Sequence, residues 1–504
     1  MTADFALRFN DFSGGDFGQL DPASAENNQY RGTNVTVYDT GLIGPRAGLK
    51  AVPITGLPTH THAPGPKAFS TVGNRLLIVL DRLYQIPLDT LAAAAQNTYP
   101  TSAANSVRFA RANNNVLYSL KDGVVYKHVG VATAAISAPA TFSDIVFWQQ
   151  WLVGIDATAP DLIWFTELTT AGSNFDVWPA NNFLYVGGNE PITALLPIYN
   201  TLYAGKAEGW WAISGILGIQ AAVRAISLGN GPLDSRRSAV TTDNRIIYWP
   251  NQDSPATFNG ESVRIFTRHK LRQAQSVFPS DGIAVTPTHQ KVYMAGNADA
   301  VGADTDLYEL DQGRWSYLSL NRAIGGITPS DPRNGTGLPS GVIFTVNNPT
   351  TIGDPVIISS LRHDLDRPAH TSDAWASPTD PGETKLLAGS FDLKAWYDSQ
   401  GRQVRVKSVI VQFRKWTSGV TNSLNRFSMR VDAHGGYESG TSEGQLVEWY
   451  EPSERATDAG VDDSWRVNFN TSWGNGFQVK FPDIAGCAIR EVIVLVDIRT
   501  TKTG

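Results

Sequence analysis

Cysteine is almost absent from this chain, which has one, Cys487, among 504 residues. A single cysteine cannot form an intramolecular disulfide, so no oxidised framework holds the fold together. The same count excludes a metal site built from several thiolates. We therefore expect Cys487 to be a small buried hydrophobic residue.

Methionine and charge are also scarce. The chain has three Met, and 17% of its residues are charged, below the roughly 25% of an average globular protein. Long runs of Leu, Glu and Lys, which favour helices, are few. Glycine and proline, in contrast, number 46 and 28, and 14 tryptophans accompany them. Short strands joined by tight turns fit this composition, so we expect a mainly β protein.

Neither a targeting signal nor a membrane-spanning run is evident. The N-terminus has no basic region before an apolar core, so we expect no secretory signal and synthesis in the cytoplasm. The most apolar run, residues 212–223, spans about a dozen residues, whereas a membrane helix needs roughly 18. The formal net charge of -6 does not suit a protein that reads DNA sequence, but it suits a conduit along which a polyanion slides.

A unit made of a polar turn, a hydrophobic β-rich run and a second, often aromatic run recurs between residues 66 and 365. The spacing, roughly 35 to 50 residues, matches one four-stranded blade of a β-propeller. We therefore predict a β-propeller-like domain of about seven blades over residues 56–366, with each hydrophobic run as the inner strand of its blade. Residues 307–318 are expected to form one outer hairpin, with Trp315 packed in it. The hydrophobic runs are 76–79, 116–120, 151–155, 201–205, 245–249, 291–294 and 342–346.

A second domain is predicted after the repeats. Residues 367–384 are rich in Pro, Ser, Thr and Asp without apolar periodicity, which indicates a linker. Beyond it, several runs alternate apolar with polar residues, as half-buried strands do. The last run, 489–498, is apolar nearly throughout and should lie centrally. We predict an antiparallel β-sandwich over residues 385–504.

Catalytic and metal-binding patterns are weak. The carboxylate pairs Asp304 with Asp306 and Asp462 with Asp463 have no spacing diagnostic of a glycosidase, and we expect them in solvated loops. The oxygen-rich loop that begins with Asn297 and Asp299 lacks the glycine and closing Glu of a calcium loop. His60 and His62 alone leave a zinc site short of ligands. No nucleophile elbow or nucleotide-binding loop is present, so we predict no enzyme, no cofactor and no metal site.

The densest basic stretch, residues 264–272, has two interpretations. It is a possible contact for phosphate or for an acidic partner. A solvated strand edge, kept charged against aggregation, is the simpler interpretation.

The first fifty residues are rich in glycine around one short strand, residues 35–37. Phe12-Ser13-Gly14-Gly15 leads through Tyr30 and Asn34 into a segment containing Gly41, Gly44 and Pro45-Arg46-Ala47-Gly48. Glycine supplies tight bends and proline fixes one φ angle, so we predict an extended arm over residues 1–55 that lies on another molecule.

The order of these motifs resembles the N-termini of tailed-bacteriophage virion proteins, in particular the tail nozzle, or tail tubular, proteins of short-tailed phages. The resemblance implies a structural protein in the virion tail, made in the host cytoplasm and arranged as a ring of six copies. Such a ring closes the DNA channel below the head-to-tail connector, retains the genome and then lets double-stranded DNA pass. The implied partners are adaptor or connector proteins and, further, tail fibre or spike proteins. The arm residues expected at the assembly interface are Phe12, Gly14, Gly15, Tyr30, Asn34, Gly41, Pro45 and Arg46.

Two other functions stay open. A propeller that binds or cleaves carbohydrate in host recognition is conceivable, because tryptophan rings stack on sugars. A minor protein of a long, flexible tail is the other alternative.

Overall fold

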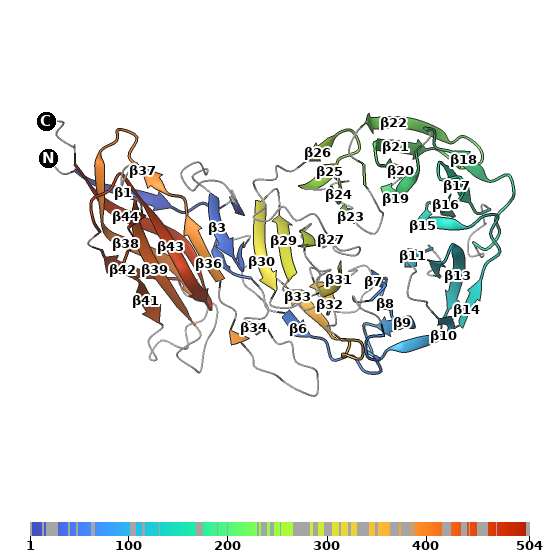
Figure 1. Cartoon of the computed structure of the whole chain (residues 1–504), viewed down its shortest axis with the longest axis horizontal. Coiled ribbons are helices and arrows are strands. Elements are labelled where there is room, and N and C mark those ends of the chain that lie inside the picture. Colours follow the sequence, from blue (N-terminus) through green and yellow to red (C-terminus); the bar gives the residue numbers. More distant parts are fainter. Residues whose placement is uncertain are drawn as a thin grey trace.

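The fold is mainly β, and the described residues contain no helix (Figure 1). They lie in two bodies side by side, a ring of small sheets and a body of two larger sheets, with both chain termini at the far end of the latter. The computed structural model describes residues 3–12, 15–16, 29–38, 41–46, 49–61, 66–100, 107–112, 116–130, 132–167, 175–188, 190–198, 200–228, 231–232, 239–241, 246–251, 254–265, 283–285, 291–296, 305–311, 314–320, 324–329, 342–347, 351–362, 372–373, 385–386, 389–415, 425–434, 441–442, 444–450, 462–469 and 471–499.

Within these residues the ring, which we call the propeller-like body, consists of seven four-stranded antiparallel sheets. The first sheet consists of β7 (Ala68–Val72), β8 (Arg75–Val79), β9 (Arg82–Pro87) and β10 (Ala94–Pro100), and the second of β11 (Val107–Arg111), β12 (Leu117–Lys121), β13 (Val124–Val129) and β14 (Ala132–Ala135). The third consists of β15 (Phe142–Trp148), β16 (Trp151–Asp156), β17 (Leu162–Phe165) and β18 (Phe183–Tyr185), and the fourth of β19 (Ile192–Ile198), β20 (Thr201–Lys206), β21 (Gly209–Ser214) and β22 (Ala222–Leu228). The last three are β23 (Ala239–Thr241), β24 (Ile246–Asn251), β25 (Ser254–Phe258) and β26 (Val263–Ile265); β27 (Ile283–Val285), β28 (Val292–Gly296), β29 (Thr305–Asp311) and β30 (Arg314–Leu320); and β31 (Ile324–Pro329), β32 (Val342–Asn347), β33 (Ile358–Arg362) and β6 (Leu49–Ala51).

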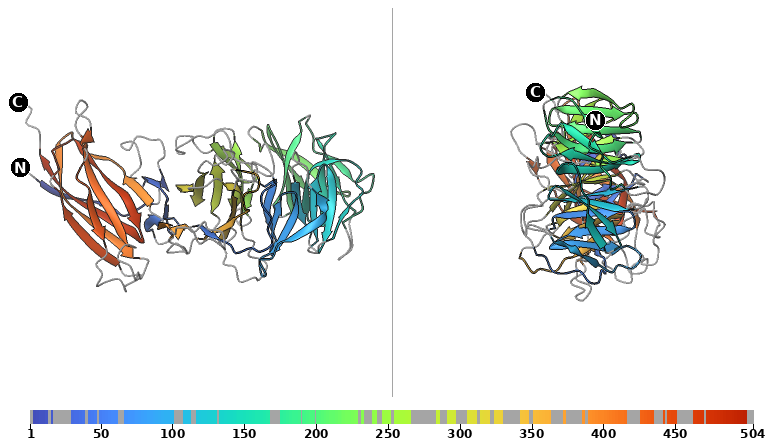
Figure 2. Two further views of the ribbon diagram at one scale, coloured as in Figure 1. Left: turned by 60° about the horizontal axis from the view of Figure 1, so that its bottom comes forward. Right: turned by 90° about the vertical axis from the view of Figure 1, so that its right-hand side faces the viewer.

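These sheets form a ring, so the predicted propeller-like fold is confirmed (Figures 1 and 2). The first strands β7, β11, β15 and β19 contact one another in turn, as do β23, β27 and β31, and a contact of β31 with β7 closes the circle. The fourth and fifth sheets meet through Trp210 and Phe258. The last sheet takes its outer strand, β6, from the N-terminal part of the chain, where β6 pairs with β33. The ring is thus closed by a strand that precedes it in sequence.

The hydrophobic runs predicted as inner strands are the second strands of their sheets instead. β8, β12 and β16, for example, each lie between two strands of their own sheet, and all six residues of β16 are buried. A second strand is covered by strands at both edges and by neighbouring sheets on both faces, whereas a first strand has one edge toward the ring centre. The most continuous apolar run therefore marks the second position.

Aromatic residues fill the spaces between sheets. The Trp210 ring of β21 stacks on Phe258 of β25 with the ring centroids 4.9 Å apart, which joins the fourth sheet to the fifth. Trp148 and Trp151 are likewise buried in the cluster shared by the third and fourth sheets. Several tryptophans thus occupy the core. The predicted outer hairpin is present as β29 and β30, although the side chain of Trp315 lies outside the described part.

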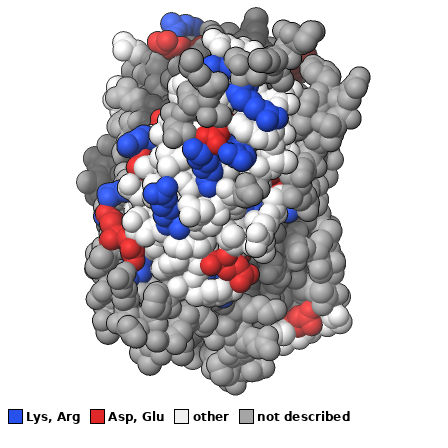
Figure 3. Space-filling view, turned by 90° about the vertical axis from the view of Figure 1, so that its left-hand side faces the viewer, with Lys and Arg blue, Asp and Glu red and all other residues white. Residues whose placement is uncertain are grey.

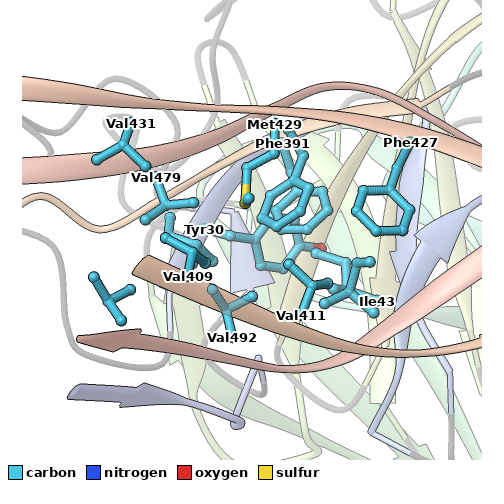
Figure 4. Packing of buried hydrophobic residues seen from close by; sticks show 14 of the residues in the cluster. Tyr30, Ile43, Phe391, Val409, Val411, Phe427, Met429, Val431, Val479 and Val492 are labelled. Atoms are coloured by element: carbon cyan, nitrogen blue, oxygen red, sulfur yellow. The ribbon is translucent and has the colours of Figure 1, made fainter. Parts of the chain in front are cut away.

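The second body consists of a six-stranded and an eight-stranded sheet that face each other across one hydrophobic core (Figure 4). Phe391, Phe427 and Met429 come from one sheet, and Val409 and Val492 from the other. Cys487 is buried in the same core, as predicted. The first sheet contains β1 (Ala3–Phe9), β4 (Val35–Val37), β5 (Ile43–Pro45), β38 (Gln403–Lys415), β42 (Asp462–Asn468) and β44 (Cys487–Arg499), and the second contains β2 (Gly15–Asp16), β3 (Gln29–Thr33), β36 (Gly389–Leu393), β37 (Trp396–Tyr397), β39 (Arg426–His434), β40 (Thr441–Ser442), β41 (Val447–Tyr450) and β43 (Gly476–Ala485).

This two-sheet body does not match the predicted domain of residues 385–504 alone. The N-terminal strand β1 pairs with β44 over seven residues, from Ala3 opposite Ile498 to Phe9 opposite Val492. β3 pairs with β36, and β5 pairs with β44 at Ile43. The propeller-like body is therefore inserted between two parts of the two-sheet body. Most of the predicted linker 367–384 lies outside the described residues, apart from β34 (Ser372–Asp373), which pairs with β35 (Lys385–Leu386).

A histidine is buried between the first two sheets of the ring. His128 Nε2 lies 2.7 Å from Ser119 Oγ and its Nδ1 lies 3.0 Å from Thr133 Oγ1. Burial lowers the pKa of His128 to about 4 from its ordinary value of 6.5.

This histidine should make stability depend on pH. Between pH 6.5 and about 4 the unfolded chain takes up a proton at His128 that the folded chain does not, so stability is full above pH 6.5 and falls as the pH drops toward 4. The loss should reach about 3 kcal/mol. Urea unfolding of the parent and of His128→Asn at several pH values measures it, because the variant should lose less over this interval. Equal losses of stability in both proteins would show that His128 is not the source of the pH dependence.

Candidate functional site

The most elaborate polar arrangement in the described residues lies where the two bodies meet. β2, β3 and β4 of the two-sheet body contact β30 of the sixth sheet. In Figure 1 these N-terminal strands lie between the two-sheet body and β30. Four N-terminal side chains, from Tyr30, Asn34, Thr36 and Arg46, reach partners on the propeller-like body. We call this set and its partners the junction.

Asn34 anchors one part of the junction through its backbone and its side chain. Its φ angle of 57° is in the left-handed region, which Asn tolerates better than most residues. Its N–H donates to the Tyr317 carbonyl at 3.0 Å, and its Oδ1 accepts the Ser319 N–H at 2.8 Å. These two bonds lay the N-terminal chain alongside β30.

Arg46 completes this part of the junction. Its guanidinium donates from Nε to Asn34 Oδ1 at 3.1 Å and from Nη2 to the Ser319 carbonyl at 3.3 Å. Arg46 is 1% exposed, and a buried charge of this kind is tolerated only when its donors are satisfied. The Arg46 guanidinium therefore joins Asn34 of the two-sheet body to Ser319 of the propeller-like body through two hydrogen bonds of fixed direction.

A second part of the junction is ionic. Glu309 on β29 is 1% exposed, and its Oε1 accepts from Lys291 Nζ at 3.1 Å and from Thr36 Oγ1 at 2.8 Å. Lys291 and Glu309 both belong to the sixth sheet region, whereas Thr36 comes from β4. The hydroxyl of Thr36 thus ties the two-sheet body to an ion pair inside the propeller-like body.

Tyr30 links the junction to the hydrophobic core. Its hydroxyl lies 3.0 Å from Ser316 Oγ on β30, while its ring packs edge-on against Phe391. Phe12 also packs edge-on against Phe391, with ring centroids 6.3 Å apart. Figure 4 shows the Tyr30 ring among the core residues near Phe391. The same N-terminal segment therefore fills the core and crosses to the other body.

The predicted assembly residues are brought together only in part. Phe12, Tyr30, Asn34 and Arg46 lie at the junction or in the adjoining core, and the Pro45 carbonyl accepts from Tyr38 Oη at 2.6 Å. Gly41 has a φ angle of 76° and closes a turn with its N–H on the Tyr38 carbonyl. The Gly15 backbone pairs with Gln29, and Gly14 lies outside the described residues.

The prediction of an extended arm over residues 1–55 that lies on another molecule does not agree with this arrangement. The described residues of this segment form strands that pair within their own chain, because their apolar side chains are needed to complete the core. Tyr30, Pro45 and Arg46 are buried in that chain and present no surface to a second copy. Sequence reasoning missed Lys291 and Glu309, which read as ordinary polar positions of two alternating strands.

The other candidate residues do not converge. Asp462 binds Arg414 and Arg490, and the His60 ring lies 3.0 Å from Asn347 Oδ1, with burial lowering the pKa of His60. Asp304, Asn297, Asp299 and His62, and most of the basic stretch 264–272, lie outside the described residues. Within the ranges given above, no group of three or more His, Cys, Asp or Glu could hold a metal ion. The same ranges include no helix long and apolar enough to cross a membrane.

Comparison with known proteins adds little to this picture. No family model and no curated protein matches the chain. Among solved structures it resembles PorZ, a bacterial surface component of the type-IX secretion system of Porphyromonas gingivalis, with 12% identity, a TM-score of 0.29 and coverage of 67% of this chain and 46% of PorZ. It also resembles Hsv2 from Kluyvelomyces marxianus, with 9% identity, a TM-score of 0.36 and coverage of 67% of this chain and 95% of Hsv2. The WD40 domain of SCAP from fission yeast is similar at 8% identity and a TM-score of 0.34, with coverage of 60% of this chain and 82% of that domain. This chain thus spans about half the length of PorZ. With scores this low, the assignment of the chain to the propeller-like folds depends on its strand pairing.

Proposed function

We propose that this chain is a structural component of a phage tail, and that it forms the nozzle that closes the DNA channel below the head-to-tail connector. The observation that supports this most is the junction, in which one N-terminal segment fixes two β bodies as a single unit through buried hydrogen bonds and an ion pair. A part that holds back a packaged genome must resist deformation, and buried hydrogen bonds and ion pairs fix the distances and angles between the segments they join.

The motif that carries the phage resemblance is also the segment that builds this junction. Tyr30, Asn34 and Arg46 are motif residues, and each bonds to β30. In this proposal the motif sets the angle between the two bodies, and copies arranged as a ring contact adaptor or connector proteins above and fibre or spike proteins below. The protein acts without catalysis and resides in the virion tail.

Electron microscopy and virion labelling test this proposal together. The purified chain should form closed rings in negative-stain images, and an antibody against it should mark the tail tip of intact virions. Particles assembled without it should fail to retain DNA. Absence from virions would contradict the proposal, as would a protein that stays monomeric and shows saturable binding or turnover on a glycan array and in a reducing-sugar assay. That last result would favour a carbohydrate-recognition propeller.

A further inference from the structure

Two strands at opposite sides of the six-stranded sheet have an unpaired edge. β1 pairs with β44 and β42 pairs with β38, while β44 and β38 pair with each other between them. In the part of the chain that the structure describes, no strand pairs with the other edge of β1 or of β42. Backbone N–H and C=O groups along such an edge bind a further strand unless something blocks it.

Proline and bulges, two common means of protecting an edge, are missing from both strands. Each strand is seven residues long, contains no proline and keeps one register with its neighbour throughout. The side chains are accessible as well. Phe5 is 46% exposed on β1, and Arg466 is exposed on β42. Both edges are therefore open to a further strand.

The directions of the strands allow the two edges to meet. β1 and β38 are both antiparallel to β44, and β42 is antiparallel to β38, so β1 and β42 run in opposite directions. A second copy displaced sideways along the sheet therefore brings its β42 antiparallel to β1. Residues directly opposite each other must then share a face of the sheet. The positions on the core side are Phe5, Leu7, Phe9, Asp463, Trp465 and Val467, and those on the outer side are Asp4, Ala6, Arg8, Asp462, Ser464, Arg466 and Asn468.

Charge on the outer side selects one register. Figure 3 views the end of the molecule formed by the two-sheet body and shows basic and acidic groups interspersed with uncharged surface, so their positions along each strand decide what fits. One register places Arg8 opposite Asp462 of the next copy and Asp4 opposite Arg466. Opposite charges directly across antiparallel strands are stabilising, and like charges are destabilising. Continuing the sheet without stagger would instead place Arg8 opposite Arg466.

The two charge contacts differ in their surroundings. Arg8 and Asp462 each have ion-pair partners in their own chain, so their contact would extend existing ion pairs. Arg466 donates to an uncharged group, Ser408 Oγ, at 3.5 Å. Arg466 is therefore the less neutralised of the two basic groups, and its contact with Asp4 is the one to alter by substitution.

The same register brings aromatic residues together on the core side. Phe5 stands opposite Trp465, which is half-buried against the core, and aromatic pairs across strands are stabilising. Leu7 stands opposite Asp463, which is the one unmatched position. Pairing of the two edges would thus extend the hydrophobic core of the body across the contact.

We infer that β1 of one copy pairs antiparallel with β42 of the next copy, so that neighbouring six-stranded sheets join into one continuous sheet. The two edges are different parts of the chain, so the contact is head-to-tail and generates rings or filaments. This inference rests on the proposed ring of copies and identifies the strands that build it.

Pairing of β1 with β1 of a second copy is the other arrangement that this edge allows. That contact is two-fold, so it joins copies only in pairs, and it leaves the β42 edges unpaired. The contact between β1 and β42 occupies both edges at once and repeats from copy to copy. The observations therefore favour it, and self-pairing of β1 is treated as an outcome of the test.

Disulfide cross-linking tests the register directly, because the sole cysteine, Cys487, is buried. Ala6 and Ser464 are exposed, and opposed Cα atoms in antiparallel strands are about 4.5–5.5 Å apart, within disulfide reach. A mixture of Ala6→Cys and Ser464→Cys proteins should form a mixed disulfide under mild oxidation. One chain carrying both substitutions should form a ladder of longer covalent oligomers. The matched control replaces Ser464→Cys by Asn468→Cys, which is exposed on the same side of β42 but about 13 Å farther along, and should form no disulfide.

Charge reversal tests the contact without cysteine. Asp4→Lys and Arg466→Asp each place like charges opposite one another, so each should raise the concentration needed for self-association about ten-fold. The double variant restores an opposite pair and should assemble within about two-fold of the parent. Arg224→Asp, at an exposed position of β22, makes the same change of net charge as Arg466→Asp and should leave assembly unchanged. Analytical ultracentrifugation measures assembly, and circular dichroism confirms that each protein is folded.

Several results would overturn the inference. A disulfide-linked pair formed by Ala6→Cys alone would show that β1 binds itself, and equal cross-linking of Asn468→Cys and Ser464→Cys would overturn the register. A parent that forms rings in negative-stain images, while Ala6→Cys and Ser464→Cys form no mixed disulfide, would exclude this contact and leave the nozzle proposal intact. Specific cross-linking in a protein that is absent from virions would support the contact and contradict the nozzle proposal, so the two failures are distinguishable.

Discussion

Glu309→Ala should lower the free energy of unfolding by about 3–5 kcal/mol, because it leaves the Lys291 ammonium buried without its carboxylate. Lys291 is 7% exposed and Glu309 is 1% exposed, so water cannot replace the lost partner without local opening. The Thr36 hydroxyl, which donates to the same carboxylate, loses its acceptor as well. Chemical unfolding followed by tryptophan fluorescence measures the loss.

An apolar replacement of the whole group is the matched control. Lys291→Met, Glu309→Leu and Thr36→Val together remove both charges and the hydroxyl at similar volume. Buried ion pairs replaced in this way often leave stability unchanged or raise it, so the triple variant should recover most of the loss. If Glu309→Ala and the triple variant unfold at the same denaturant concentration, an uncompensated buried charge is not the cause.

The same triple variant separates stability from geometry. Hydrogen bonds fix distance and angle, whereas apolar contacts tolerate sliding. With its ionic part replaced by Met, Leu and Val, the junction should therefore keep its stability but allow a wider range of angles between the two bodies, within the limits set by the remaining hydrogen bonds of Tyr30, Asn34 and Arg46. Small-angle scattering of the parent and the variant would report that range.

The fold class could be predicted because it depends on local patterns. Runs such as 76–79 and 151–155 alternate with turns at a steady spacing, and each occupies the second position of a four-stranded sheet. Apolar content identifies the most enclosed strand of a repeat. Period-two alternation at 404–413 and 477–481 indicates strands, which the structure shows as the longer β38 and β43. Neither pattern depends on distant parts of the chain.

Pairing between distant segments could not be predicted. β1 has alternating apolar residues, Phe5, Leu7 and Phe9, and reads as a strand, but its partner β44 lies at the opposite end of the sequence. β6 closes a sheet whose other strands begin at Ile324. A single sequence carries no signal for such long-range partners, so a segment with bends and a short strand was interpreted as a free arm.

The junction was predicted only through its turn residues. Gly41 and Asn34 have positive φ angles, and residues of these types signal bends wherever they occur. These residue types predict that the chain bends, but they do not predict which segment packs against the bend. Lys291 and Glu309 gave no signal, because a buried charged residue on a strand looks like a solvated one until its neighbours are known.

Deleting residues 1–46 should abolish folding of the two-sheet body. The deletion removes five core residues, Phe12, Tyr30, Val35, Val37 and Ile43, all at most 5% exposed. Each such burial contributes about 1.5–3 kcal/mol, so the loss of roughly 8–15 kcal/mol matches or exceeds the whole stability of a typical domain. The truncated chain should be insoluble, or should lack the cooperative melting transition of this body.

Point variants at Tyr30 show whether packing or the hydrogen bond matters more. Tyr30→Phe removes only the hydroxyl that meets Ser316, at a cost of about 1 kcal/mol, whereas Tyr30→Ala also leaves a cavity and should cost about 3–5 kcal/mol. If the truncated chain folds normally and loses only its self-association, the segment is an intermolecular arm after all. If truncation prevents folding while Tyr30→Phe is tolerated, the segment belongs to the core, and its glycines serve to route one chain through two bodies.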